Sequence, residues 1–549
     1  MCVSVNTHYN ECSVYIALIQ PNINLVENLV LNTYNPNSDQ YKQHLSYDEF
    51  TQLISIDSHI VKEIIDWVSH YNIYNCLNVY DSLVCQTPCT NIIQISDKQY
   101  VIQGMYKLHS NISFIITTGN ASIARFSPIY TNKLKSDSIP YVNRNTLSEL
   151  YNFTIDNSSN NFESIAVIEF GSPNGYSMKD LDKQNLYQDI DGVNVTNLNE
   201  LGLKYYGIEN ELDIQTVVLG AYKYNLSVFN WEVQGWIYEW LIDYQIRIKN
   251  NQPIPYINSV SYGWNEQDQQ AVTHFSSNMT SEMYVQRCNY EFAKLSYFGI
   301  TFVIASGDTG SPQRTNPGCQ TNIANPISPL YPGCSPWVLS VGATFQKDPK
   351  ITNDGDEWCT NLGCIVGDVS QTRNINYNEM ALEGVRWTSG GGCSFYSNVS
   401  EFQLPFTHTY FTSGVTLPPP TYYNQTTRCY PDIVANGHTA AIFVDGKPFA
   451  VDGTSLSTPT VAGMLVRLNV YLTQTNQTRI GYINPLLYYL SENQHTIFHD
   501  LVNGTTACTC DMCCNPHPQL GYIATKGWDP VFGLGSLNFG LLHSWFESQ

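Results

Sequence analysis

The sequence predicts an α/β protein built on a mostly parallel β-sheet flanked by helices, with a smaller α+β unit in front of it. Short and almost wholly apolar runs predict the strands of the sheet, at residues 164–171, 257–264, 300–308 and 337–345. Helical patterns lie between or after them, at residues 209–222, 282–298 and 456–472. Continuous apolar strands that alternate with helices are typical of a parallel sheet covered on both faces. In such sheets, ligands bind at the carboxyl ends of the strands.

The smaller unit spans residues 1–130 in this prediction. Its expected strands are residues 10–20, 99–108 and 111–119. Residues 46–73 predict two helices, with N-terminal caps at Ser46 and at Asp57 or Ser58. This order of strands and helices predicts a small α+β sandwich.

A polar stretch separates the two units. Residues 131–146 contain basic residues, serines and a proline, and they predict an exposed linker in which an activating cleavage can occur. The larger domain then spans residues 147–549.

Composition and charge exclude several classes of partner. The chain is 43% hydrophobic and only 13% charged, which is typical of a globular protein with sizeable cores. Its formal net charge of −21 argues against nucleic acid or an anionic membrane as a partner. No apolar run is long enough to span a bilayer, and the first residues lack the pattern of a secretory signal.

Cysteine usage favours an oxidising compartment. There are 16 cysteines, and sequons such as Asn111, Asn225, Asn398 and Asn503 are compatible with a secreted glycoprotein. The cysteine-rich run at 508–514 offers thiolates for zinc, but it lacks a second Cys pair at the usual spacing, so we favour disulfides there.

A serine in front of an apolar helical pattern is the first candidate catalytic residue. Ser455 follows Gly453 and Thr454, and the helix is expected to begin near Ser457–Pro459, where a proline is tolerated. Backbone N–H groups at the start of a helix can receive a developing oxyanion. The alternative is that these Ser and Thr residues only cap a core helix.

A nucleophilic serine needs a proton acceptor, and the sequence offers carboxylates rather than histidine. None of the 12 histidines lies in a recognisable catalytic setting, and His438 is the best placed of them. Glu209 and Asp213 are four residues apart, so on a helix they share one face and can share protons. The alternative for this pair is an acidic first turn favoured by the helix dipole, which Glu211 would fit equally well.

Asp308 is the third acidic candidate. It follows a buried apolar strand within glycine-rich turn chemistry. A carboxylic acid that keeps its proton can donate a hydrogen bond to an oxyanion. The alternative is an ordinary turn aspartate.

Four motifs follow one another along the chain: GIENELD (207–213), SYG (261–263), ASGDTG (305–310) and DGTSLSTP (452–459). In this order the sequence resembles the sedolisins, the serine-carboxyl peptidases, and most of all their acid-acting lysosomal tripeptidyl-peptidases. The resemblance extends to the N-terminal unit, which is similar to the family's prodomain, and to the C-terminal residues.

The resemblance implies a role for each acidic candidate. Ser455 would be the nucleophile and Glu209 the general base, which later acts as the acid toward the leaving amine. Asp213 would orient Glu209 and share its proton, and Asp308 would be the oxyanion acid beside the backbone N–H of Ser455. Because the base must be ionised while Asp308 keeps its proton, we expect a bell-shaped rate profile with an optimum at roughly pH 3–5.5.

The resemblance also implies the architecture and the biology. We expect a subtilisin-like peptidase domain and a ferredoxin-like prodomain that acts as chaperone and intramolecular inhibitor. The expected protein is a monomeric zymogen, secreted or in a lysosome-like compartment, that acts on peptides and proteins and removes tripeptides from free N-termini. A sedolisin-type endopeptidase, a neutral subtilisin-type enzyme that uses histidine, and a catalytically silent binding or coat protein are the alternatives.

The C-terminal part resembles the calcium loop of the family. One structural Ca²⁺ would be bound by carboxylates of Asp500 and Asp529 and by carbonyl oxygens of Leu501, Thr525 and Gly527, which is the oxygen-rich set that calcium prefers. Thr525 stands where the family commonly has glycine, and the alternative is a pair of turn aspartates.

Three further features bear on the resemblance. Asp452 stands where the family usually has Ser, which places a fourth carboxylate next to the nucleophile. An insertion before Cys319 puts the matching disulfide in doubt. A Cys76–Cys85 disulfide is expected in the prodomain.

Overall fold

The structure is a computed structural model that describes residues 11–96, 99–117, 129–131, 143–153, 162–170, 174–188, 190, 193–198, 205–221, 225–273, 279–311, 327–344, 388–437, 440–507 and 520–549. His438, Cys2, Cys319, Cys359, Cys364 and the cysteine-rich run at 508–514 lie outside these ranges. Most of the predicted linker, residues 132–142, also lies outside them.

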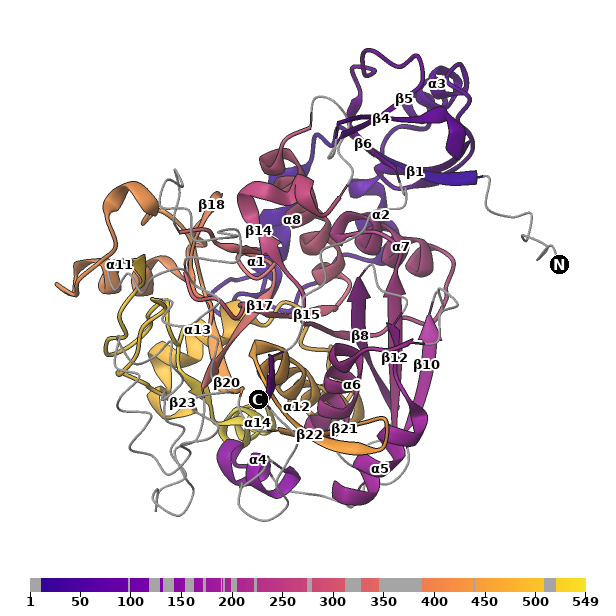
Figure 1. Ribbon diagram of the computed structural model, residues 1–549. Coiled ribbons are helices and arrows are strands. Elements are labelled where there is room, and N and C mark those ends of the chain that lie inside the picture. Colours follow the sequence, from indigo (N-terminus) through magenta and orange to yellow (C-terminus); the bar gives the residue numbers. More distant parts are fainter. Residues whose placement is uncertain are drawn as a thin grey trace.

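The N-terminal unit is the predicted α+β sandwich (Figure 1). Its elements are β1 (Glu11–Leu18), α1 (Ile23–Tyr34), α2 (Tyr47–Ile54), α3 (Ser58–Ser69), β2 (Tyr74–Val79), β3 (Ser82–Pro88), β4 (Ile92–Ser96), β5 (Gln99–Ile102) and β6 (Ile112–Thr117). The four-stranded antiparallel sheet has the order β2-β3-β1-β6, which is the ferredoxin-like order. The β4–β5 hairpin occupies the connection in which that fold has its second helix.

Local sequence signals explain the helices of this unit. Ser46 and Glu49 form a capping box at the start of α2, and the side chain of Asp57 caps α3. The expected Cys76–Cys85 disulfide is present, and a second one joins Cys12 to Cys89.

The larger domain is built on a nine-stranded sheet. The strands are, in sheet order, β10 (Asn194–Leu198), β12 (Asn225–Val233), β8 (Phe162–Phe170), β13 (Ile257–Val260), β15 (Thr301–Ala305), β17 (Leu339–Thr344), β20 (Ile433–Asn436), β24 (Ser536–Leu537) and β23 (Phe498–His499). Figure 1 shows several of its strands, among them β8, β10 and β12, side by side. All neighbouring pairs are parallel except the last, β24 with β23. The predicted parallel sheet is therefore confirmed.

Helices cover both faces of this sheet. They are α4 (Arg144–Tyr151), α5 (Met178–Gln188), α6 (Ile208–Ala221), α7 (Ile237–Lys249), α8 (Ser281–Tyr297), α11 (Leu404–Thr412), α12 (Thr454–Gln474), α13 (Asn484–Asn493) and α14 (Phe539–Glu547). Alternate residues of β8 divide between two cores: Ile165 and Val167 pack with α6 and α12, whereas Ala166 and Ile168 pack with α7 and α8. None of the helices in the described ranges is both long and apolar enough for a membrane crossing.

Smaller strands complete the domain. They are β7 (Ile129–Thr131), β9 (Asn174–Gly175), β11 (Tyr205–Tyr206), β14 (Trp264–Asn265), β16 (Leu330–Tyr331), β18 (Gly392–Asn398), β19 (Thr427–Tyr430), β21 (Ala440–Val444) and β22 (Lys447–Asp452). The β21–β22 hairpin leads into α12, and β7 pairs antiparallel with the outer edge of β22. The strand β7, which directly precedes most of the predicted linker, is therefore paired with β22, the strand that precedes Ser455.

The N-terminal unit packs against α7 and α8, as Figure 1 shows. Buried ion pairs join the two units there. Asp81 accepts from Lys294 at 2.6 Å and from Arg287 at 2.9 Å, and Glu291 pairs with both cations at 2.6 Å. Burial alone would raise the pKa of Asp81, but the charges of Arg287 and Lys294 hold it below its ordinary value. Arg287 also donates to the carbonyl of Leu18 at 2.6 Å, so the two units share one network.

Candidate active site

Ser455 lies in the first turn of α12, directly after the strand β22. The helix begins at Thr454, so the predicted start near Ser457–Pro459 was wrong by three residues or more. Gly453 makes this sharp entry possible, because its φ of +135° is a conformation that side chains rarely allow. Ser455 itself is 7% exposed, which places it at the rim of the buried core.

Apolar packing brings the helix of Glu209 and Asp213 to this turn. Leu212, which lies between the two acids on α6, shares a buried cluster with Leu456, which follows Ser455. Farther along, α6 and α12 cross in close contact. A Cβ on Gly463 would lie 2.6 Å from the carbonyl of Val217 and 2.8 Å from Gly220 Cα, so only glycine permits this approach.

Glu209 and Asp213 are buried at the carboxyl end of the sheet. Glu209 is 6% exposed and Asp213 is 0% exposed, and Ser261, just beyond β13, donates to Asp213 Oδ1 at 2.7 Å. Burial and then the charges of Glu209 and Glu169 raise the pKa of Asp213 well above its ordinary value. The carboxyl of Asp213 therefore holds its proton more tightly than an ordinary aspartate does.

A further buried acid extends this group. Glu169, at the end of β8, accepts from the hydroxyl of Tyr262 at 2.5 Å and lies in register with Glu232 of β12. Burial and the charges of Glu209 and Glu232 raise its pKa well above the ordinary value. Four carboxyl groups thus gather at the ends of neighbouring strands, where parallel sheets bind ligands.

Asp308 lies in the loop that follows β15, and its side chain contacts the start of α12. Its Oδ1 accepts from the backbone N–H of Thr454 at 2.8 Å and from the Thr454 hydroxyl at 2.7 Å. Asp308 thus lies one residue away from Ser455, on the side of the helix N-terminus. This is where an oxyanion formed at Ser455 would need hydrogen-bond donors.

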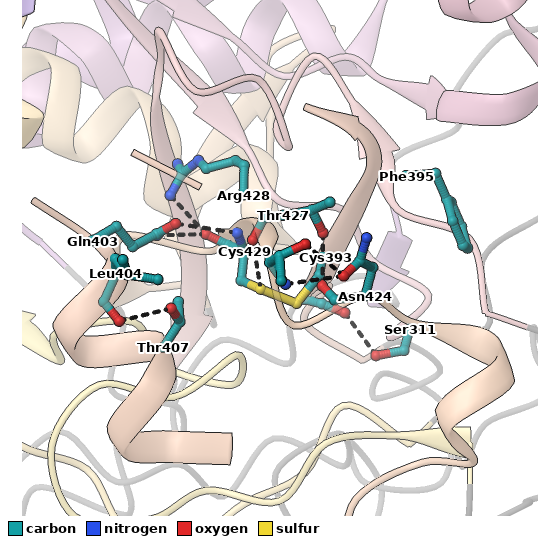
Figure 2. Close-up of a disulfide and its surroundings, with 12 residues drawn as sticks. Ser311, Cys393, Phe395, Gln403, Leu404, Thr407, Asn424, Thr427, Arg428 and Cys429 are labelled. Carbon is teal, nitrogen blue, oxygen red and sulfur yellow. Dashed lines mark hydrogen bonds between the residues drawn. A yellow bond between two sulfur atoms is a disulfide. The ribbon is translucent and has the colours of Figure 1, made fainter. Parts of the chain in front are cut away.

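The loop of Asp308 is held by the segment before β18. Gly390 donates to the carbonyl of Gly307 at 2.7 Å, and Thr388 donates to the carbonyl of Asp308 at 2.9 Å. Figure 2 shows the neighbouring Cys393–Cys429 disulfide, which joins β18 to β19, with Ser311 beside it. This framework keeps Asp308 in place against α12.

Asp452 does not point into open solvent. It is the last residue of β22, is 1% exposed and lies opposite Ile129 of β7 in the strand pairing. The residue that departs from the family pattern is therefore buried and lies beside β7, the strand that precedes the linker.

The calcium candidates lie together beyond the edge strand β23. Asp529 is fully buried; its Oδ2 accepts from Thr525 N at 2.7 Å, and Asp500 Oδ2 accepts from Gly527 N at 2.8 Å. Burial raises the pKa of Asp529 well above its ordinary value, and the charge of Asp500 contributes. A bound cation would offset both the burial of Asp529 and its repulsion with Asp500, and calcium prefers oxygen ligands of this kind. Gly527 has a φ of +83°, and Thr525 is not among the described residues with positive φ, so its side chain brings no strain.

Sequence reasoning missed Glu169, Tyr262 and Thr454 as parts of the site. A signal for Glu169 was present, because an acid inside an otherwise apolar strand of a covered sheet is unusual. Tyr262 lies in the SYG motif and Thr454 precedes the serine, but only the fold shows which acid each of them contacts.

Comparison with known proteins decides the family. The chain is 30% identical to physarolisin of Physarum polycephalum over 571 residues, covering 99% of this chain and 95% of that protein. This chain belongs to the sedolisin family of serine-carboxyl peptidases. It is 24% identical to tripeptidyl-peptidase 1 of Mus musculus over 580 residues, covering 97% of this chain and 91% of the mouse protein.

Domain comparisons agree with a sedolisin made with an activation domain. Residues 5–123 match the pro-kumamolisin activation domain, and residues 233–480 match the subtilase family. The structure of Pseudomonas sedolisin, solved with two molecules of pseudo-iodotyrostatin, aligns with 75% of this chain. The alignment includes 100% of the sedolisin chain. With a TM-score of 0.54 at 21% identity, it shows the same subtilisin-like fold. The protein is thus a serine-type peptidase with an N-terminal activation domain.

Proposed function

We propose that this sedolisin is an acid-acting peptidase that is made as a zymogen and cleaves through an acyl-enzyme on Ser455. The observation that supports this most strongly is the convergence of Asp308 and α6 on the first turn of α12. Asp308 bonds to Thr454 at 2.7 Å, and Leu212 packs with Leu456.

The proposed chemistry uses the same three acids in both halves of the reaction, and Glu209 acts first as base and then as acid in each half. Glu209 takes the proton of Ser455 as its oxygen attacks the carbonyl carbon of the scissile peptide bond. Asp213 steadies Glu209 by sharing its own proton. Asp308 and the N–H of Ser455 donate to the oxyanion, and Glu209 then protonates the leaving amine. Water repeats the sequence to release the acyl group.

The substrate mode that we propose is release of tripeptides from free N-termini in an acidic compartment, lysosomal or extracellular. The 24% identity with mouse tripeptidyl-peptidase 1 supports this mode. The test incubates the acid-treated protein with one peptide in free and N-acetylated forms at pH 3–8, and identifies the products by mass spectrometry. Tripeptides from the free form alone support the proposal. Internal cleavage of both forms would instead identify an endopeptidase.

The position of β7 supports the zymogen state that we propose. Because Ile129–Thr131 pairs with the strand that leads to Ser455, the intact chain passes next to the nucleophile. We propose that the N-terminal unit inhibits the peptidase until cleavage between residues 131 and 146 releases it.

Calcium is proposed as a single structural ion held by Asp500, Asp529 and the carbonyls of Leu501, Thr525 and Gly527. A chelator at pH 6 is expected to lower the Tm of Ser455→Ala protein by about 5–10 °C, and added Ca²⁺ to restore it. In the additional Asp500→Asn variant, which keeps an oxygen for Gly527 N–H, the chelator should change little. An unchanged Tm in the parent protein would argue for two turn aspartates without calcium.

A further inference from the structure

The face of α6 opposite the catalytic acids is tied to the hairpin that carries the nucleophile. Gln215 is fully buried and contacts β21 with both ends of its amide. Its Nε2 donates to the carbonyl of Phe443 at 2.8 Å, and the N–H of Phe443 donates to its Oε1 at 2.8 Å. The side chain thus bonds to the edge of β21 as a neighbouring strand would.

A second acid fixes the orientation of this amide. The other N–H of Gln215 donates to Glu211 Oε2 at 2.9 Å, and Glu211 Oε1 accepts from the backbone N–H of Ser177 at 2.6 Å. Burial, with smaller contributions from Asp180 and Asp445, raises the pKa of Glu211 to about 8. Every donor and acceptor of the Gln215 amide is therefore satisfied in one orientation.

These bonds add direction to a contact that is otherwise apolar. Leu212 packs against Ile442, Val444 and Leu456, and such packing is not directional, so it alone allows α6 to slide along the hairpin. Hydrogen bonds are directional and fix the register between them. β22 pairs with β21 and enters α12 directly, so this register sets where Ser455 lies relative to Glu209.

We infer that Gln215 is a positioning residue for peptide hydrolysis, because its paired hydrogen bonds to Phe443 lock the helix of Glu209 and Asp213 to the hairpin that delivers Ser455. The inference rests on the catalytic roles proposed above. It predicts that loss of these bonds lowers kcat more than it changes KM, because the substrate cleft keeps its shape while the reacting groups move apart.

The first test compares two glutamines on the same hairpin edge. Gln215→Leu removes the two hydrogen bonds to Phe443 and the one to Glu211. It is expected to lower kcat ~10–100-fold with KM changed less than about threefold. Gln184→Leu is the matched control, since Gln184 of α5 donates to the carbonyl of Ala441 at 2.9 Å but lies on a helix without catalytic residues. Its kcat should be unchanged. Equal kcat in both variants and wild type would overturn the inference.

The second test holds even where Gln215→Leu fails to fold. In Gln215→Glu, a protonated carboxyl can still accept from Phe443 N–H and donate to its carbonyl, whereas the ionised form cannot donate. The charged groups around this contact are Glu211, which accepts from Gln215, Asp180 and Lys183 of α5, which both bond to Gly446, and Asp445 and Lys447 in the hairpin. Because position 215 is as buried as Glu211, the new carboxyl should lose its proton only as pH approaches neutrality, so kcat relative to wild type is expected to fall ~10-fold or more between pH 5 and pH 8. A constant ratio would overturn the inference.

Two catalytic variants separate the possible failures. If Ser455→Ala and Glu209→Gln are inactive while both Gln215 variants behave as wild type, only the positioning role is wrong. If those two catalytic variants keep full activity, the proposed function itself fails.

Discussion

Glu209→Gln is expected to lower peptide hydrolysis at pH 4.5 by ~10²–10⁴-fold, because an amide cannot accept the proton of Ser455. Ser455→Ala should cost more, on the order of 10⁶-fold, since no acyl-enzyme can form. Neither change removes volume from the core, and Glu209 lies at the rim with 6% exposure, so both proteins should fold. Initial rates on a free N-terminal peptide, with circular dichroism as a check on folding, measure the effect.

The same variants test self-processing. Acid treatment should convert the wild-type chain to a shorter form, while Ser455→Ala stays full length if the protein cleaves itself. Glu149→Gln is the matched control, because it is an exposed helical glutamate on α4 whose substitution should leave the rate unchanged. Full activity of Glu209→Gln, together with a rate maximum at pH 7 or above, would favour a histidine-dependent enzyme instead.

The folded protein is expected to lose stability as pH rises from about 4.5 to 8. Burial, the largest cause at each site, raises the pKa of Glu211 to about 8 and the pKa values of Glu239 and Glu266 to about 7. The pKa values of Glu169 and Asp213 are raised well above the ordinary value. Because these pKa values are higher in the folded state, the folded protein binds more protons than the unfolded chain in this range.

The sign and size of the effect follow from linkage. Stability from these groups is fully present below their unfolded pKa and is lost as pH rises through the folded pKa, at up to ~1.4 kcal/mol per pH unit for each group. The lowered pKa of Asp81 acts in the opposite sense, since its protonation in stronger acid weakens the ion pairs with Arg287 and Lys294. We therefore expect the highest Tm in mild acid.

Thermal unfolding of Ser455→Ala protein, which avoids self-digestion, measures this profile between pH 3 and pH 8. The additional Glu266→Gln change, which removes one buried acid that accepts from Ser394 at 2.5 Å, should flatten the decline between about pH 4.5 and pH 7, because the pKa of Glu266 is raised to about 7 in the folded protein. A Tm that rises toward pH 7 would contradict the assignment of these carboxyls as protonated in the fold.

The α/β architecture could be predicted from the sequence, because the pattern of apolar residues that marks a buried strand or helix is visible within a short segment of chain. Apolar runs predicted β8, β13, β15 and β17, and the spacing of apolar residues predicted α6, α8 and α12. The helix α1 was not predicted: Asn22 is a residue type that often caps helices, but the first turn of α1 holds no acid that would strengthen this signal. Cys76 and Cys85 are close in sequence, so their disulfide was predictable, whereas the 77-residue separation of Cys12 and Cys89 requires the tertiary fold.

The site could be predicted in its residue types but not in its contacts. Spacing suggested that Glu209 and Asp213 share a helix face, yet only the sheet order shows that Ser261 and Glu169 meet them. From the sequence, Glu211 could be interpreted as part of an acidic first turn of the helix. In the structure it is buried where α6 contacts the β21–β22 hairpin. Such long-range placements depend on strands that are neighbours in space and distant along the chain.

The charge network beneath the N-terminal unit bears on how the enzyme can be produced. A truncated version that starts at α4 would lose Asp81, which leaves Glu291 as the counter-ion of Arg287 and Lys294 among the residues that the structure describes. It would also expose the ring of Tyr238, which Phe114 contacts in the full chain. Such a fragment is expected to aggregate on expression, and supplying residues 1–130 as a separate polypeptide during refolding should rescue its yield.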